Sequence, residues 1–148
     1  MHRLVREQFF TRPRKEIFAF FADAANLERI TPESLRFEML TPMPIEMKPG
    51  ALLDYRLKLF GIPVRWTSRI ETFEPETSFS DVQIKGPYRS WHHRHEFFEH
   101  EDGTLMRDTV DYALPLGPLG ALVRRLFVSR NLDRIFLHRR AVLRAEFL

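Results

Sequence analysis

The C-terminal stretch from residue 115 to residue 148 constrains the fold most, because it is long and nearly free of helix-breaking residues. After Gly117, Pro118 and Gly120 it contains no further glycine or proline. A proline in the first turn with no later breakers predicts a long helix. With helical periodicity its apolar residues form two stripes: Leu119, Leu122, Val123, Leu126 and Phe127 in the first, and Leu132, Ile135, Phe136, Val142, Leu143 and Phe147 in the second. The phase changes at residues 129–131, which predicts a kink or two segments packed against different parts of the fold.

One charged residue, Arg139, lies at the centre of the second apolar stripe. The other arginines of this segment fall on the opposite face, where water can solvate them: Arg130, Arg134, Arg140 and Arg144. An arginine on a core-facing stripe must extend to solvent, pair with a buried acid or point into a polar cavity. The helix alone leaves these three alternatives open.

Composition predicts a single domain over residues 1–148, since a chain of this length with 44% hydrophobic residues can bury a sizeable core. Its basic residues are dispersed, so the net charge of +3 does not indicate nucleic acid as a partner. The absence of cysteine excludes disulfides, a thiolate nucleophile and zinc–thiolate sites. A charged N-terminus and the lack of a long apolar run predict a cytoplasmic protein without stable membrane insertion.

The rest of the chain reads as one strand, two helices and six further strands. We expect a helix from Pro13 with Ile17, Phe18 and Phe21 on one face, and a second short helix over residues 26–30. The expected strands cover residues 4–10, 35–40, 52–60, 64–71, 79–85, 90–99 and 104–114. An antiparallel meander of this length must curl, and the final helix would fill its concave face. The expected class is therefore α+β.

The last two expected strands can be aligned, because their connection at Glu101 and Asp102 sets the register. The predicted opposing pairs are Trp91 with Tyr112, His93 with Val110, His95 with Asp108, and Phe97 with Met106. Most of these residues are apolar, so this face should point inward. His95 and Asp108 are then a buried cross-strand pair, with His93 diagonal to the acid.

The strand over residues 79–85 is ambiguous about which face is buried. Val82 and Ile84 make one face the more apolar, whereas Asp81 and Gln83 lie on the other. We expect Asp81 and Gln83 to face inward, because an interior that already holds Arg139, two histidines and an aspartate needs polar partners.

Four interpretations of this polar group remain open from the residues alone. His-x-His on a strand beside an aspartate is typical of a metal-binding face, although no third nitrogen or sulfur ligand is evident, so we expect neither metal nor cofactor. A His95–Asp108 pair is also a candidate general acid or base. The group could instead orient the polar end of an apolar ligand, or form an internal network without any ligand.

Several motifs together resemble those of the SRPBCC (START/Bet v 1-like) superfamily, in particular its stand-alone bacterial, cyclase/dehydrase-like members. They are Gly86-Pro87-Tyr88, Trp91-x-His93-x-His95-x-Phe97, Gly103-Thr104-x-Met106-x-Asp108-x-Val110-x-Tyr112, and Ile135-Phe136-x-x-Arg139. The resemblance implies a helix-grip fold, in which a curved seven-stranded antiparallel sheet wraps around the C-terminal helix and encloses a cavity. Relatives bind lipids, sterols, polyketides, plant hormones or quinones, and a minority are aromatase/cyclases.

The resemblance leads us to expect binding of a hydrophobic or aromatic small molecule, such as a lipid, polyketide or quinone, in the internal cavity. The expected wall is Tyr55, Trp66, Trp91, Phe97, Tyr112 and Phe136, and the expected polar end is Asp81, Gln83, His93, His95, Asp108 and Arg139. The alternative is a cyclase or dehydratase in which His95, oriented by Asp108, removes a proton while Arg139 stabilises an enolate. Further alternatives are contact of the arginine-rich helix face with a membrane surface or partner, and a homodimer through an edge strand.

Overall fold

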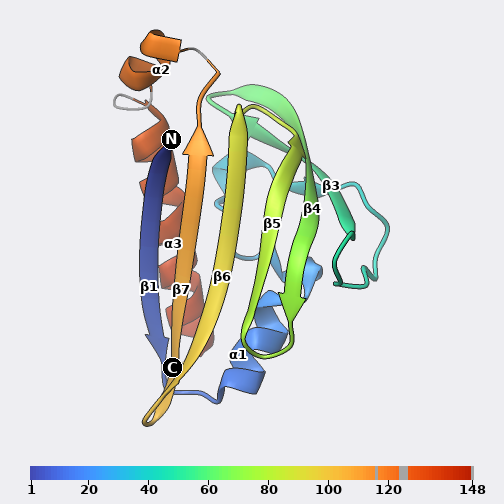
Figure 1. The fold of residues 1–148 in the computed structure, drawn as a ribbon, viewed down its shortest axis with the longest axis vertical. Coiled ribbons are helices and arrows are strands. Elements are labelled where there is room, and N and C mark those ends of the chain that lie inside the picture. Colours follow the sequence, from blue (N-terminus) through green and yellow to red (C-terminus); the bar gives the residue numbers. More distant parts are fainter. Residues whose placement is uncertain (116, 124–126, 148) are drawn as a thin grey trace.

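The computed structural model describes residues 1–115, 117–123 and 127–147, which form one curved sheet with helices on its concave side (Figure 1). The strands are β1 (His2–Phe10), β2 (Glu38–Met39), β3 (Leu52–Leu59), β4 (Ile62–Glu74), β5 (Ser78–Lys85), β6 (Ser90–His100) and β7 (Gly103–Ala113). The helices are α1 (Arg14–Phe21), α2 (Gly117–Val123) and α3 (Ser129–Glu146), with 3-10 turns η1 (Ala24–Asn26) and η2 (Glu33–Leu35). None of these helices is long and apolar enough to cross a bilayer.

The seven strands form a single antiparallel sheet in the order β1-β7-β6-β5-β4-β3-β2. The predicted register of the β6–β7 hairpin is confirmed, because His95 pairs with Asp108 and Phe97 with Met106. Alternate residues of β7 are buried from Thr104 to Tyr112. The alternation of side chains along a strand therefore places the His95–Asp108 pair inside the molecule.

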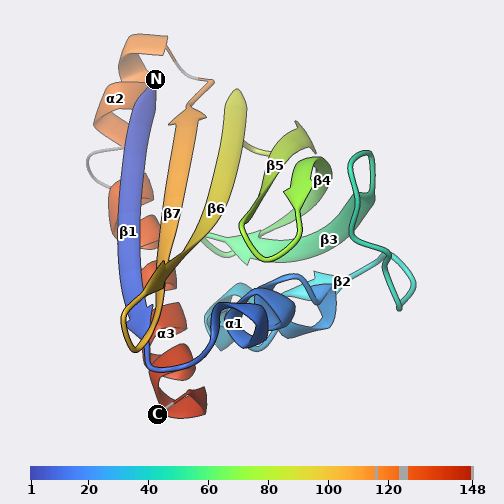
Figure 2. The ribbon, with the colours of Figure 1, turned by 60° about the horizontal axis from the view of Figure 1, so that its bottom comes forward.

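Helix α3 lies along the concave face of the sheet, behind β1 and β7 in Figure 1, and runs past the end of β1 in Figure 2. The second apolar stripe holds it there, since Leu132, Phe136 and Leu143 are buried. Arg139 is buried on the same stripe and only 8% exposed. This is the helix-grip arrangement that the motifs implied.

The first apolar stripe is largely exposed. Helix α2 is separate from α3, and Leu119, Leu122 and Phe127 are each more than half exposed. Among the described residues of this stripe, Val123 packs against the core, beside Val128. Of the two alternatives expected at residues 129–131, a kink or two segments, the structure has two separate helices, α2 and α3, with α3 beginning at Ser129; Leu126 lies outside the described residues.

Two expectations for the N-terminal half are wrong. The short helix expected over residues 26–30 is a 3-10 turn at Ala24–Asn26 followed by further turns, and the strand expected over residues 35–40 is reduced to Glu38–Met39. Arg36 has a positive φ of 48°, which interrupts any extended strand from Leu35. Helix α1 matches its prediction, because Ile17, Phe18 and Phe21 are buried together.

The interior is divided into packed regions around a gap. One cluster joins α1 to the turn end of the β6–β7 hairpin through Phe18, Phe97 and Met106. A second joins α3 to the upper part of β7 through Val110 and Phe136. A third lies against β3 and β4. The residues that face the gap between these clusters define the candidate site.

Candidate functional site

A cavity of about 200 Å³ lies between the sheet, α3 and the N-terminal helical turns. Its wall is mostly apolar and aromatic, which is typical of small-molecule sites. Strand β3 contributes Leu53, Tyr55 and Leu57, and β4 contributes Trp66 and Ile70. Because side chains alternate along a strand, the inward faces of β3 and β4 form this part of the wall.

The aromatic wall is held by contacts between rings. Tyr55 stacks on Trp66 with an interplanar angle of 16°, and Trp91 meets Trp66 edge-on, with ring centroids 5.2 Å apart. Tyr88 lies against both tryptophans. Burial raises the pKa of the Tyr55 and Tyr88 phenols, so both remain neutral. Such ring pairs restrict side-chain motion and keep the wall open as a pre-formed surface.

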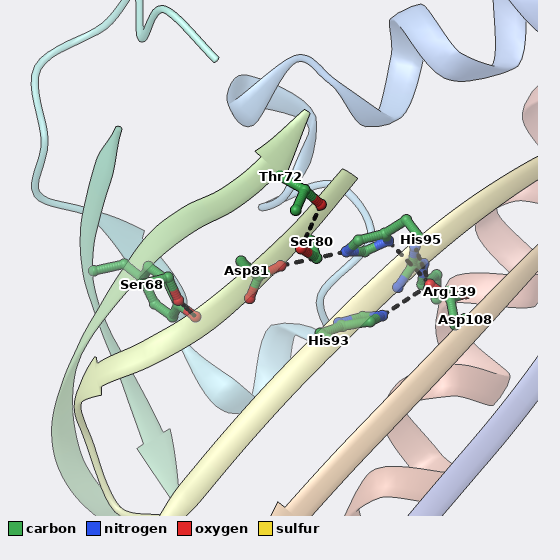
Figure 3. A network of polar contacts seen from close by, with 9 residues as sticks. Ser68, Thr72, Ser80, Asp81, His93, His95, Asp108 and Arg139 are labelled. Atoms are coloured by element: carbon green, nitrogen blue, oxygen red, sulfur yellow. Dashed lines mark hydrogen bonds and ion pairs between the residues drawn. The ribbon is translucent and has the colours of Figure 1, made fainter. Parts of the chain in front are cut away.

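One end of the cavity carries a cluster of ionisable side chains drawn from four elements (Figure 3). Asp81 comes from β5, His93 and His95 from β6, Asp108 from β7 and Arg139 from α3. Asp81 lies opposite His93 in the β5–β6 register, which confirms that its side chain faces inward. We call these five residues the polar cluster.

Asp108 is the centre of the polar cluster, because one of its oxygens contacts three cationic or imidazole groups. Its Oδ1 lies 2.8 Å from His93 Nε2 and 3.5 Å from Arg139 Nη2. His95 Nδ1 is 3.0 Å from the same oxygen, but the contact is too bent for a hydrogen bond. Of the two imidazole contacts with Asp108, the diagonal one from His93 is the one with hydrogen-bond geometry.

The two imidazoles are stacked and have different electrostatic surroundings. Their ring centroids are 3.8 Å apart, and His95 also stacks on Phe79 at 4.2 Å. Burial, reinforced by His95, lowers the pKa of His93 despite Asp108. Burial also opposes the charging of His95, but the carboxylates of Asp108 and Asp81 outweigh it and raise the pKa of that imidazole. Of the two imidazoles, His95 is therefore the more basic.

Arg139 resolves its position on an apolar stripe by pairing with a buried acid. Its guanidinium lies over the rings of Phe21, at 4.8 Å, and Phe136, at 5.6 Å. Burial alone would raise the pKa of Asp108, but the guanidinium and the two imidazoles hold it well below its usual value. Of the three alternatives open from the sequence, the arginine adopts two, since it also lines the cavity.

Most of the expected site residues surround the cavity, and four do not form part of its wall. Tyr55, Trp66, Asp81, Trp91, His93, His95, Phe136 and Arg139 line it. Asp108 lies behind the two histidines and reaches the crevice between β1 and α3. Gln83 instead holds the β5–β6 turn through both backbone groups of Tyr88. Phe97 and Tyr112 are packed in the clusters on either side of the cavity.

Sequence reasoning missed cavity residues that come from outside the regular strands. Ala24, Leu27 and Ile30 reach the wall from the turns after α1, and Tyr88 reaches it from the turn between β5 and β6. Turn residues carry no periodic signal that separates a wall position from a solvent position. The aromatic character of Tyr88 beside Gly86 and Pro87 was the only cue.

The sequence matches the family described as polyketide cyclase / dehydrase and lipid transport over residues 11–136. No curated protein matches it. Among solved structures, the Zhui aromatase/cyclase from Streptomyces sp. R1128 superposes with a TM-score of 0.76 at 15% identity, over 98% of this chain and 92% of that chain.

Two further structures show how widely this fold is shared. TTHA0849 from Thermus thermophilus has a TM-score of 0.72 at 18% identity, over 97% of this chain and 99% of that chain. Ginseng major latex-like protein 151 from Panax ginseng has a TM-score of 0.67 at 14% identity, over 99% and 97%. At these identities the likeness concerns the fold alone, whereas the family match spans most of the sequence. The chain therefore belongs to the polyketide cyclase/dehydrase and lipid transport family of the SRPBCC superfamily.

Proposed function

We propose that this protein binds a hydrophobic or aromatic small molecule of the lipid, polyketide or quinone class in the cavity between the sheet and α3. The observation that carries the proposal is the aromatic wall, in which Tyr55, Trp66 and Trp91 face a cavity of about 200 Å³ with the polar cluster at one end. An apolar ligand would bury its body against the rings and direct a polar atom to the cluster.

A buried donor on the wall supports this proposal. The indole Nε1 of Trp66 is inaccessible to solvent and has no hydrogen-bond partner among the described residues. Buried donors of this kind are rare and call for a physical explanation. A carbonyl or hydroxyl oxygen on a ligand, brought close by a small rotation of the ring, would satisfy it.

The two tryptophans of the chain provide the assay, because both line the cavity. Titration with 1,4-naphthoquinone should quench their emission to a saturable limit, and a saturated fatty acid should be compared as a lipid probe. The chain has no cysteine, so the quinone cannot add to a thiol. Quenching that rises linearly without saturation would contradict the proposal.

A larger side chain at Ala24, in the turn after α1, should weaken ligand binding by filling part of the cavity. Ala24 is buried and lines the cavity, so Ala24→Leu places a larger side chain where the ligand would lie. We expect the affinity for the probe to fall at least about tenfold, which is about 1.4 kcal/mol. Ala25→Leu is the matched control, since the next side chain is exposed and should leave affinity unchanged. Equal affinities for the two variants would place the ligand elsewhere.

A second candidate function is a cyclase or dehydratase reaction in the same cavity. The buried His95, beside Asp108 and Asp81, favours it, because carboxylates orient an imidazole and raise its basicity. His95 would move a proton beside a substrate carbonyl, and Arg139 would stabilise the enolate. His95→Gln should then lower turnover of a poly-β-ketone substrate at least about 100-fold, measured with ligand affinity as the control. Full turnover in this variant would exclude the reaction.

A further inference from the structure

Asp81, His93 and His95 bring three potential metal ligands together at the polar end of the cavity. One ligand atom from each residue lies within 4.8 Å of the others. The β5–β6 register places Asp81 directly opposite His93, and His95 follows two positions later on the same face. The third ligand that the sequence left unidentified is thus a carboxylate supplied by the neighbouring strand.

The imidazole nitrogens that do not contact Asp108 have suitable chemistry for a metal ion. Asp108 accepts a hydrogen bond from Nε2 of His93, and its carboxylate lies 3.0 Å from Nδ1 of His95, where it favours a proton once Nε2 binds an ion. The remaining nitrogen of each imidazole then carries a lone pair. His95 Nε2 is 3.4 Å from Asp81 Oδ2, which is long for a hydrogen bond. Two ligands bound tetrahedrally to one zinc ion are about 3.3 Å apart.

The surroundings of the three side chains resemble the outer layer of a metal site. A carboxylate that contacts the second nitrogen of a ligating histidine fixes the orientation of the ring and increases its basicity. Asp108 does this for both histidines, and Arg139 holds Asp108 from the other side. With both imidazoles neutral, two carboxylates and one guanidinium leave the cluster with a net charge of about −1, which favours a dication.

We propose that Asp81, His93 and His95 bind one divalent transition-metal ion of the zinc or iron(II) class, with Asp108 as the outer carboxylate. Two imidazoles and one carboxylate match the preference of these ions, whereas Mg²⁺ and Ca²⁺ prefer oxygen ligands. Three protein ligands leave coordination positions that face the cavity. An oxygen atom of a bound small molecule can occupy one of them, although the ion needs no such ligand in order to bind.

Calorimetric titration of the EDTA-treated, untagged protein with Zn²⁺ tests the proposal without any organic ligand. We expect one ion per chain, no binding of Mg²⁺, and visible absorption bands on substitution with Co²⁺. Asp81→Asn keeps the size of the side chain and removes its charge. It should weaken Zn²⁺ binding by more than the roughly 10–100-fold typical of an outer partner. His93→Ala should abolish the binding.

The matched control is His92→Ala, which removes an imidazole from the outer face of the same strand. It should leave stoichiometry and affinity unchanged. Absence of Zn²⁺ binding by the wild-type protein, unchanged affinity in Asp81→Asn, or loss of binding in His92→Ala would each overturn the proposal. If His93→Ala does not fold, Asp81→Asn alone decides, because Asp81 is partly exposed to the cavity and its replacement is isosteric.

The result also separates the two candidate functions described above. An ion on His95 would occupy the lone pair that a general base needs. Zn²⁺ binding together with naphthoquinone binding would favour a receptor site, whereas failure to bind metal leaves hydrophobic binding to be judged by the tryptophan assay. The two proposals can therefore fail independently.

Discussion

Replacing Asp108 with asparagine is expected to reduce the free energy of unfolding by about 3–5 kcal/mol. Asp108 carries the negative charge that neutralises Arg139, and both side chains are at most about 10% exposed. Asparagine keeps the shape but leaves the guanidinium buried without a counter-charge. Urea denaturation at pH 7 in metal-free buffer measures this loss of stability. The dependence of the unfolding free energy on urea concentration shows whether the folded state stays compact.

Asp111→Asn on the same strand is the matched control. Asp111 also pairs with an arginine, Arg3, but the pair lies on the outer face and the Arg3 side chain is 66% exposed. Exposed pairs of this kind contribute at most about 1 kcal/mol. Equal decreases in the free energy of unfolding in the two variants would contradict the view that burial makes the Asp108 contact important for stability.

The stabilisation from Asp108 should also depend on pH with a defined sign. The folded pKa of Asp108 is held well below its usual value, so the unfolded chain takes up this proton first as the pH falls. The contribution is complete above about pH 4, the range of a free aspartate, and declines below that as the folded pKa is approached. The difference between wild type and Asp108→Asn in the free energy of unfolding should therefore narrow as the pH falls below about 4.

Much of the sheet could be predicted because alternation and short turns restrict strands strongly. The turn at Glu101 and Asp102 fixes the β6–β7 register, and a shift by one residue would turn His95 and Phe97 towards solvent. Apolar alternation alone does not predict that Asp81 faces inward, since Val82 and Ile84 make the opposite face of that strand the more apolar one. Asp81 was predicted to face inward because buried charges need partners, and its position on the cavity wall confirms this orientation.

The segments that were predicted wrongly are those in which tertiary contacts override local pattern. Residues 26–30 have helical spacing, yet the chain turns there so that Leu27 and Ile30 reach the cavity and the core. The stripe on α2 has helical spacing as well, but the short helix leaves Leu119 and Leu122 in solvent. Spacing describes which residues share a face, not whether anything covers that face.

The polar cluster could be predicted in composition but not in connectivity. His95 and Asp108 were predicted to pair because they are directly opposite in the hairpin, whereas the imidazole that hydrogen-bonds to Asp108 is the diagonal one, His93. The contribution of Asp81 depends on the alignment of β5 with β6, and β4 and β5 contain register shifts that no local turn rule predicts. Long-range geometry therefore determines whether the cluster can bind a metal ion.

Replacing Phe97 with alanine is expected to cost about 3–5 kcal/mol of stability, the range for removing a buried aromatic ring. Phe97 is 2% exposed and its ring contacts those of Phe18, Phe21 and Phe79. Loss of the ring would leave a cavity where α1 packs against β6. Denaturant or thermal unfolding would measure the resulting loss of stability.

Phe98→Ala provides the sharpest comparison, because it removes the same ring from the opposite face of the same strand. Phe98 is 38% exposed and its main partner is the guanidinium of Arg107, at 5.0 Å from the ring. A contact of this type at an exposed site contributes about 0.5–1 kcal/mol. A larger loss for Phe98→Ala than for Phe97→Ala would mean that β6 is turned over. His93 and His95, on the same face of β6 as Phe97, would then face solvent. Both the cavity-binding and the metal-binding proposals would then be wrong, because both depend on this register.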